Sequence, residues 1–424
     1  MRTRFIYLSV CLLALLLPNC NTSVDTFSDR HDGSYAGYLF TYFTGNRQSQ
    51  EAIHYAISSD GYRFRALNGD QPIMDSRAIS STGGVRDPHI LRSPDGESFR
   101  MVATDMVSAN GWDSNRAMVL LKSDNLLEWT SSVVNVQDRF DGQDSLRRVW
   151  APQTIWDPEA EKYLVYWSMK HGERGPDIIY YAYANDDFTD LETKPEQLLS
   201  TPDGGGAIDG DIVLHDGTYH LFFKTEDRDR GLKVATADRV TGPYTVGQEF
   251  VQQTTFPVEG SSVYPRIDGD DYVLMYDVYT EGRYQFARTS DLKNFEVIDE
   301  KISMNFNPRH GTVIPITHTE MDRLLSRFGR PDDLIGMTDN PAIQSDNIRL
   351  DTLGRRLVLP VVPETDLAAF DPGFLDVAGL GLAPTGEQDF SAGPVPYTVA
   401  MEGHPPVTYA VEVVTADSAV LTSY

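Results

Sequence analysis

The sequence predicts an all-β protein in which a five-bladed β-propeller is followed by a small C-terminal β-sandwich of immunoglobulin-like type. The first observation is a repeat: an apolar strand, a Ser-Asp-like pair and an aromatic residue recur five times, at intervals of 52 to 64 residues, with Asp at positions 60, 124, 186, 238 and 291. The second is a series of hairpin signals between these copies, where apolar strands turn at Asp or Gly and return as aromatic-rich strands. Several antiparallel strands within about 50–65 residues match the size of one four-stranded propeller blade.

The propeller is expected to span residues 38–318, and its fifth blade is split between the two ends of that region. Four repeats are complete. The first segment, from "GYLFTYFTGN" to "EAIHYAISSDGYRF", has outer strands without an innermost one, whereas "PRHGTVIPIT" (Pro308–Thr317) is an innermost strand without followers. We therefore expect these two half-units to pair and to close the ring.

The N-terminus is typical of a secreted chain. "MRTRF" is basic, and the apolar run after it is of secretory type and too short for a comfortable membrane span. The run ends at "LLPNCNTS", which resembles a bacterial lipoprotein signal with Cys20 as the lipidated residue. We expect residues 1–20 to be this signal and residues 21–37 a polar tether; an ordinary signal peptide with an incidental Cys20 is the alternative. The expected location is the cell envelope, lipid-anchored, or the exterior.

Composition excludes several classes of function. The formal net charge is −26, which disfavours nucleic acids and anionic membranes as partners, so membrane contact is expected only through the lipid. Cys11 would leave with the signal, so the mature domains hold no cysteine for catalysis, a disulfide or a metal. We expect a monomer.

The chain changes character after the propeller. "TEMDRLLSRFG" predicts a short helix that ends at Gly329, and residues 319–348 as a whole are expected to be helix and linker. From residue 349 to 424, short strands separated by Gly- and Pro-rich turns predict the immunoglobulin-like β-sandwich. No catalytic constellation is visible in it.

Candidate catalytic residues occupy matching places in the repeat. The predicted innermost strands start at Asp87, Ala151, Asp209, Glu259 and His310. Each has a purely structural explanation: Asp87 and Asp209 suit turns, with Asp211 a competitor for the role of Asp209, and Glu259 could pair with Arg283. Together, however, three carboxylates would meet at one mouth of the central channel, where like charges and burial raise pKa values. That set suits glycoside hydrolysis, in which one carboxylic acid protonates the leaving oxygen and another carboxylate acts on water or on the sugar.

Five segments in this order, "RDPHILR", "VWAPQTIW", "AIDGDIV", "VEGSSVY" and "RHGTVIPIT", resemble the five-bladed family 43 glycoside hydrolases across roughly residues 38–317. The resemblance implies inversion of anomeric configuration, with Asp87 as general base, Asp209 as the carboxylate that tunes the acid, and Glu259 as general acid. It implies that His310 lies beside a central metal ion, often Ca²⁺. An inverting pair should stand about 6.5–9.5 Å apart.

The expected function is therefore an inverting glycosidase acting on side chains of polysaccharides or oligosaccharides, most similar to α-L-arabinofuranosidases or β-xylosidases. An exo-β-galactosidase or galactanase on the same fold is an alternative, as is a non-catalytic glycan-binding surface lipoprotein. A sugar phosphorylase would need a basic phosphate cluster that the sequence lacks. Candidate substrate-binding residues are Trp150, Lys224, Tyr264, Arg283 and Arg309.

Overall fold

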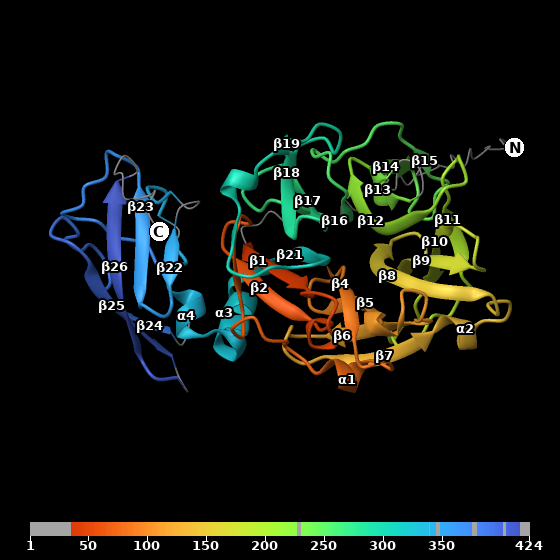
Figure 1. Ribbon diagram of the computed structural model, residues 1–424, viewed down its shortest axis with the longest axis horizontal. Coiled ribbons are helices and arrows are strands. Elements are labelled where there is room, and N and C mark those ends of the chain that lie inside the picture. Colours follow the sequence, from red (N-terminus) through yellow and green to blue (C-terminus); the bar gives the residue numbers. More distant parts are fainter. Residues whose placement is uncertain are drawn as a thin grey trace, which may run out of the picture.

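A computed structural model (Figure 1) describes residues 35–226, 230–338, 340–344, 348–374, 380–401 and 404–415. The proposed signal and most of the proposed tether lie outside these residues. The described part is built mainly of strands: five sheets, antiparallel except for one short parallel pair, surround a common centre, and a sixth sheet lies beside them. The predicted all-β propeller followed by a C-terminal β domain is confirmed.

Each of the first four blades is a four-stranded antiparallel meander whose innermost strand comes first in the sequence. Blade 1 consists of β4 (Val85–Arg92), β5 (Phe99–Asp105), β6 (Ala117–Ser123) and β7 (Thr130–Asn135), and blade 2 of β8 (Leu146–Asp157), β9 (Lys162–His171), β10 (Asp177–Tyr183) and β11 (Glu196–Leu199). Blade 3 consists of β12 (Ala207–His215), β13 (Thr218–Thr225), β14 (Gly231–Ala237) and β15 (Thr245–Val246), and blade 4 of β16 (Glu259–Pro265), β17 (Tyr272–Val278), β18 (Arg283–Thr289) and β19 (Glu296–Val297).

The fifth blade closes the ring as the split repeat predicts. Its innermost strand β21 (Gly311–Thr317) pairs with β1 (Tyr35–Tyr42) in antiparallel register, from Gly311 opposite Tyr42 to Thr317 opposite Tyr35. Strands β2 (His54–Ser58) and β3 (Arg63–Ala66) continue outward, and the short β20 (Ser303–Met304) joins β3 in parallel. Apolar faces of neighbouring blades pack together; for example Val102 and Met118 of blade 1 belong to the same hydrophobic cluster as Trp167 of blade 2. Because the five sheets close into a ring, their innermost strands surround one central channel.

Short helices fill the connections. They are α1 (Ser76–Ile79), α2 (Val136–Arg139), α3 (His318–Phe328) and α4 (Pro331–Leu334), with 3₁₀ turns η2 (Gln48–Gln50), η3 (Ser108–Asn110) and η4 (Asp299–Lys301). The predicted helix is α3: Thr317 and Glu320 form its capping box, and Gly329 follows its last residue. Among the described residues, no helix is long and apolar enough to cross a membrane.

The C-terminal domain presents one five-stranded sheet in the order β22-β23-β26-β25-β24. The strands are β22 (Arg349–Asp351), β23 (Arg356–Val361), β24 (Leu380–Ala383), β25 (Val395–Met401) and β26 (Val407–Thr415), and only β23 and β26 run parallel. Isolated bridges add to this sheet: Ile343 pairs with Val361 of β23, and Phe370 pairs with Gln388 in the loops between the strands. Ile335 and Ile343, which the sequence placed in a linker, belong to the core of this domain.

Candidate active site

The catalytic mouth of the channel is built on β-bulges in the innermost strands. Pairing with the second strand shifts register at Asp87 in β4, at Ala151 in β8, at Asp209 in β12 and at Gly260 in β16. These four residues have φ between 44° and 60°, a left-handed conformation that is uncommon for residues other than glycine. A bulge bends the strand and redirects a side chain, so Asp87 and Asp209 are turned out of the regular pleat.

The expectation that Asp87, Ala151 and Asp209 begin their strands is therefore wrong. Asp87, Ala151 and Asp209 lie inside β4, β8 and β12, and the position in blade 4 that matches them is Gly260, not Glu259. Glu259 is the first residue of β16 and precedes the bulge. His310 directly precedes β21. A Cβ added to Gly260 would lie 2.0 Å from the His310 ring, so glycine is required where the imidazole crosses.

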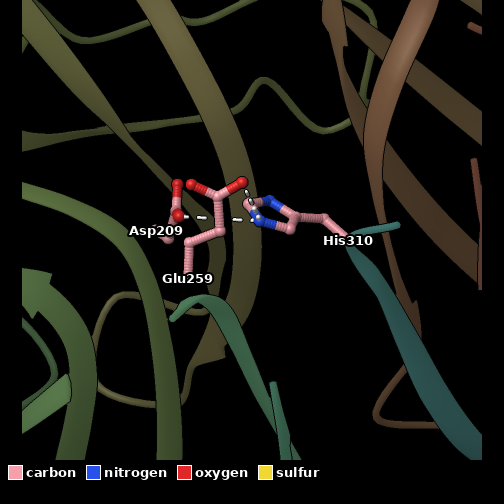
Figure 2. A group of neighbouring side chains, drawn as sticks. All are labelled: Asp209, Glu259 and His310. Carbon is pink, nitrogen blue, oxygen red and sulfur yellow. Dashed lines mark ion pairs between the residues drawn. The ribbon is translucent and has the colours of Figure 1, made fainter. Parts of the chain in front are cut away.

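His310 lies at the centre of the cluster, between all three predicted carboxylates. Its Nδ1 is 3.2 Å from Oδ1 of Asp87, while its Nε2 is 3.5 Å from Oε1 of Glu259 and 3.8 Å from Oδ2 of Asp209. Figure 2 shows the carboxylates of Asp209 and Glu259 facing the imidazole. Burial alone would lower the pKa of His310, but the three surrounding carboxylates outweigh it and raise the pKa well above its usual value. The three carboxylates therefore favour the protonated, imidazolium form of the ring.

Asp87 is held in its ionised form. Although burial opposes ionisation, the hydrogen bond and the charge of His310, together with nearby Arg86 and Thr104, lower the pKa of Asp87 below its usual value. The hydroxyl of Thr104 donates to Oδ2 of Asp87 at 2.8 Å. An ionised carboxylate with both oxygens fixed is suited to accept a proton from water, which is the task of a general base.

Glu259 is surrounded by cations. Arg309 donates to its Oε1 at 2.9 Å, and Lys224 donates to its Oε2 at 3.2 Å. Arg309 also binds the buried carboxylate of Asp277 on β17. Burial would raise the pKa of Glu259, but His310, Lys224 and Arg309 lower it below its usual value. In this arrangement, without a sugar in place, Glu259 is ionised.

The pKa of Asp209 is shifted in the opposite direction to that of Glu259. Its Oδ2 accepts from the backbone N–H of Gly260 at 3.1 Å. Burial and the charge of Glu259 raise the pKa of Asp209 to about 6, against the lowering effect of His310. Ligating atoms of Asp209, Glu259 and His310 all lie within 4.8 Å of one another. At this distance the protons belong to the group as a whole, and the pair Asp209–Glu259 keeps one proton below about pH 6.

The residues around His310 offer only part of a calcium site. Ca²⁺ takes six to eight oxygen ligands, whereas Asp209, Glu259 and His310 offer one ligand atom each, and Nε2 of His310 has no hydrogen-bond partner among the described residues. Nδ1 of His310 faces Asp87, and Lys224 and Arg309 already contact Glu259. We therefore derive no catalytic step through a metal.

A small cavity adjoins the cluster. It has a volume of about 20 Å³, is lined by Asp87, Asp209 and His310 among others, and has room for about one water molecule. A much larger cavity of about 290 Å³ lies farther along the inner strands, and Asp211 lines it. Oδ2 of Asp211 accepts from the N–H of Val263, so the two-residue ambiguity of the sequence is resolved: Asp209 faces His310 and Asp211 does not.

The predicted substrate-binding residues separate into two groups. Lys224 and Arg309 contact Glu259, and Trp150 directly precedes Ala151 at the mouth, its ring covered on one side by Arg148 and touched at the edge by Trp112. Tyr264, in contrast, is fully buried between blades 4 and 5, where its hydroxyl donates to the carbonyl of Gly61. It does not face the site.

Arg283 does not contact Glu259 either. It pairs with Asp299 at 3.6 Å, and the proposed partnership with Glu259 belongs instead to Lys224 and Arg309.

Sequence reasoning missed two residues of the site. Thr104 and Asp277 lie near the ends of second strands, β5 and β17, and their position after the catalytic strands was the available signal. Trp112, which touches the edge of Trp150, lies on the loop after β5 with half of its surface exposed.

Comparisons with known proteins identify the family of the propeller region. The model of a glycoside hydrolase 43-related family, described as a "probable glycosyl hydrolase domain", matches residues 33–322. An α-L-arabinofuranosidase of Bifidobacterium longum subsp. longum is 25% identical in an alignment 298 residues long, which covers 57% of this chain; the chain spans about a quarter (27%) of that relative's length.

Solved structures with a similar fold include a thermostable family-43 glycoside hydrolase, with 16% identity and a TM-score of 0.47, covering 64% of this chain and 92% of the other. A second is a family 43 protein of Bacillus licheniformis, with 13% identity and a TM-score of 0.42, covering 63% of this chain and 56% of the other. The family match extends over more than half of the chain and contains the whole carboxylate cluster. This chain therefore belongs to the glycosyl hydrolase family related to family 43.

Proposed function

We propose that this chain is an inverting glycosidase that releases α-L-arabinofuranosyl side chains from polysaccharides or oligosaccharides. The observation that carries the proposal is the placement of Asp87 and Glu259 on opposite ring nitrogens of His310. A ring's width therefore separates the two carboxylates. Inverting enzymes keep base and acid about 6.5–9.5 Å apart to admit water, whereas retaining enzymes use about 5–5.5 Å. The intervening imidazole favours the wider spacing.

In the proposed reaction, Asp87 removes a proton from a water molecule while the water oxygen bonds to the anomeric carbon. The glycosidic C–O bond breaks, and the leaving oxygen takes a proton from Glu259. Because Glu259 is ionised among its cations when no sugar is present, its proton has to come from the Asp209–Glu259 pair, where the raised pKa of Asp209 stores it. The lowered pKa of Asp87 suits the general base, and the raised pKa of Asp209 suits the residue that stores the proton.

The choice of arabinofuranoside rests on the α-L-arabinofuranosidase relative, of whose length this chain spans about a quarter. The test is hydrolysis of aryl α-L-arabinofuranosides, β-xylosides and β-galactosides, with proton NMR of the first-formed sugar anomer. Inversion on the arabinofuranoside supports the proposal. Preference for another glycoside overturns the substrate, and retention overturns the mechanism.

The Glu259→Gln variant separates an enzyme from a glycan-binding protein. It should lose most activity on alkyl glycosides and keep more on substrates whose leaving group needs no proton. Equal rates for the variant and the parent would show that Glu259 is not the general acid.

We further propose an envelope location through lipidated Cys20, on the basis of the signal-like residues 1–20. Incorporation of labelled palmitate that is lost in Cys20→Ser would support it, and retention of the label would contradict it.

A further inference from the structure

Thr104 lies directly beside the bulge that carries Asp87. It is on β5, opposite Arg86 of β4, and its side chain is fully buried. Its Oγ1 is 2.8 Å from Oδ2 of Asp87 and 2.9 Å from the backbone nitrogen of Ala151. Because it is shut off from the mouth, Thr104 can affect a reaction only through the groups that it contacts.

The direction of both hydrogen bonds follows from chemistry. A backbone N–H can only donate, so the Thr104 oxygen accepts from Ala151, and the hydroxyl proton is left to donate to Asp87. The two bonds form a chain that runs from the main chain of blade 2, through blade 1, to the carboxylate. Each bond in such a chain polarises the next, and a donor to a carboxylate favours its ionised form.

Through these two hydrogen bonds, blade 2 contributes to the site although blade 2 supplies no carboxylate. Ala151 occupies the same bulge position as Asp87 and Asp209, with a φ of 44°. A left-handed conformation costs a non-glycine residue about 1–3 kcal/mol and persists only when its surroundings hold it. Here the N–H of Ala151 that the bulge presents is directed at Thr104.

The contacts of Asp87 divide between its two oxygens. Oδ1 faces His310 and Oδ2 accepts from Thr104, so rotation of the carboxylate is blocked from both sides. A carboxylate has about four acceptor positions, and these two contacts leave positions on both oxygens for water. The orientation of the free positions is then fixed by His310 and Thr104 together.

We propose that Thr104 is the positioning residue of the general base: supported by the N–H of Ala151, its hydroxyl orients Asp87 and keeps it ionised. The inference rests on the proposed function, since it assigns a role within the same site.

The experiment compares Thr104→Val, which keeps the shape and removes the hydroxyl, with Thr104→Ser, which keeps the hydroxyl. For Thr104→Val we expect kcat/KM to fall about tenfold to a hundredfold, the size expected for a lost bond to a charged group, with KM changed less than about twofold. The acidic limb of the pH profile of kcat/KM, which reports the base, should move up by about one pH unit. Thr104→Ser should restore the parent limb.

Thr154→Val is the matched control. Thr154 is a buried threonine on β8 whose hydroxyl donates to the carbonyl of Leu164 and touches no carboxylate. It should lower Tm about as much as Thr104→Val and leave the acidic limb in place. An additional Thr104→Val change in an Asp87→Ala background should cost little residual activity, because the residue through which Thr104 acts is gone.

The inference is overturned if Thr104→Val leaves the acidic limb unchanged, if Thr154→Val moves it equally, or if Thr104→Val costs as much without Asp87 as with it. A parent protein that hydrolyses no glycoside at all would instead refute the proposed function, and the two failures are therefore distinguishable.

Discussion

Nδ1 of His310 lies 3.2 Å from Oδ1 of Asp87, and both side chains are only 12–13% exposed. The imidazolium thus takes the place of a counter-ion inside a group of three carboxylates. His310→Gln keeps a polar side chain but removes the charge. We expect the acidic limb of kcat/KM to rise, because Asp87 loses the cation that lowers its pKa. An unchanged limb in the variant would contradict this role.

The same residue makes stability depend on pH in a defined direction. The pKa of His310 is raised in the folded protein, so its contribution to stability is fully present below its unfolded pKa of about 6.5 and is lost as pH rises through the folded value. The parent should therefore exceed His310→Gln in Tm by more at pH 6 than at pH 9. A difference that grows towards pH 9 would show that the ring is neutral.

Asp209→Asn should shift the basic limb of the pH profile. Removing the carboxylate removes a repulsion that opposes ionisation of Glu259, and it also removes the place where the raised pKa stores a proton. Glu259 should lose its proton at lower pH, so the basic limb of kcat should shift to lower pH, with activity at pH 7 reduced at least tenfold on alkyl glycosides. Aryl glycosides with acidic leaving groups should be affected less. An equal loss on both substrates would argue against a role in proton supply.

Chelation should leave the enzyme unaffected. Both nitrogens of His310 are directed at carboxylates, and Lys224 and Arg309 occupy Glu259, so the cluster balances its own charge. Dialysis against EDTA should change kcat/KM by less than about twofold, and added Ca²⁺ should not raise it. Recovery by Ca²⁺ of activity lost on dialysis would show that a metal displaces the contacts seen in the structure.

The sequence contained enough to predict the blades and the ring closure, because each depends on local signals: hairpin turns, aromatic strands and two complementary half-units. It could not reveal the bulges, since a bulge is defined by pairing with a neighbouring strand. The predicted equivalence of Glu259 with Asp87 failed for that reason; Gly260 is the residue that matches.

The direction in which side chains point could not be predicted from the sequence either. Tyr264 is close to Glu259 in sequence, but its ring packs against Tyr38 and Phe64 between two blades. Thr104 and Asp277 carry no motif of their own, and only the register of β4 with β5 and of β16 with β17 brings them to the carboxylates. Long-range pairing of this kind has no local signature in a single sequence.

Asp211→Asn should stabilise the protein near neutral pH. Asp211 lines the cavity of about 290 Å³ among apolar residues, and burial raises its pKa to about 7, against the lowering effect of the N–H of Val263. A carboxyl whose folded pKa is raised keeps its proton in the folded state while the unfolded chain has lost it. The folded protein is therefore penalised as pH rises from about 4 to about 7, by up to about 4 kcal/mol at 1.36 kcal/mol per pKa unit.

Asparagine removes this penalty and still accepts from Val263, so Tm of Asp211→Asn should exceed that of the parent at pH 8, and the two should converge near pH 4. Asp216→Asn, at the exposed turn after the same strand, is the control and should shift Tm little at either pH, because asparagine tolerates the left-handed conformation there. Equal Tm values for Asp211→Asn and the parent at pH 8 would mean that the Asp211 carboxylate is solvated through the cavity rather than buried in it.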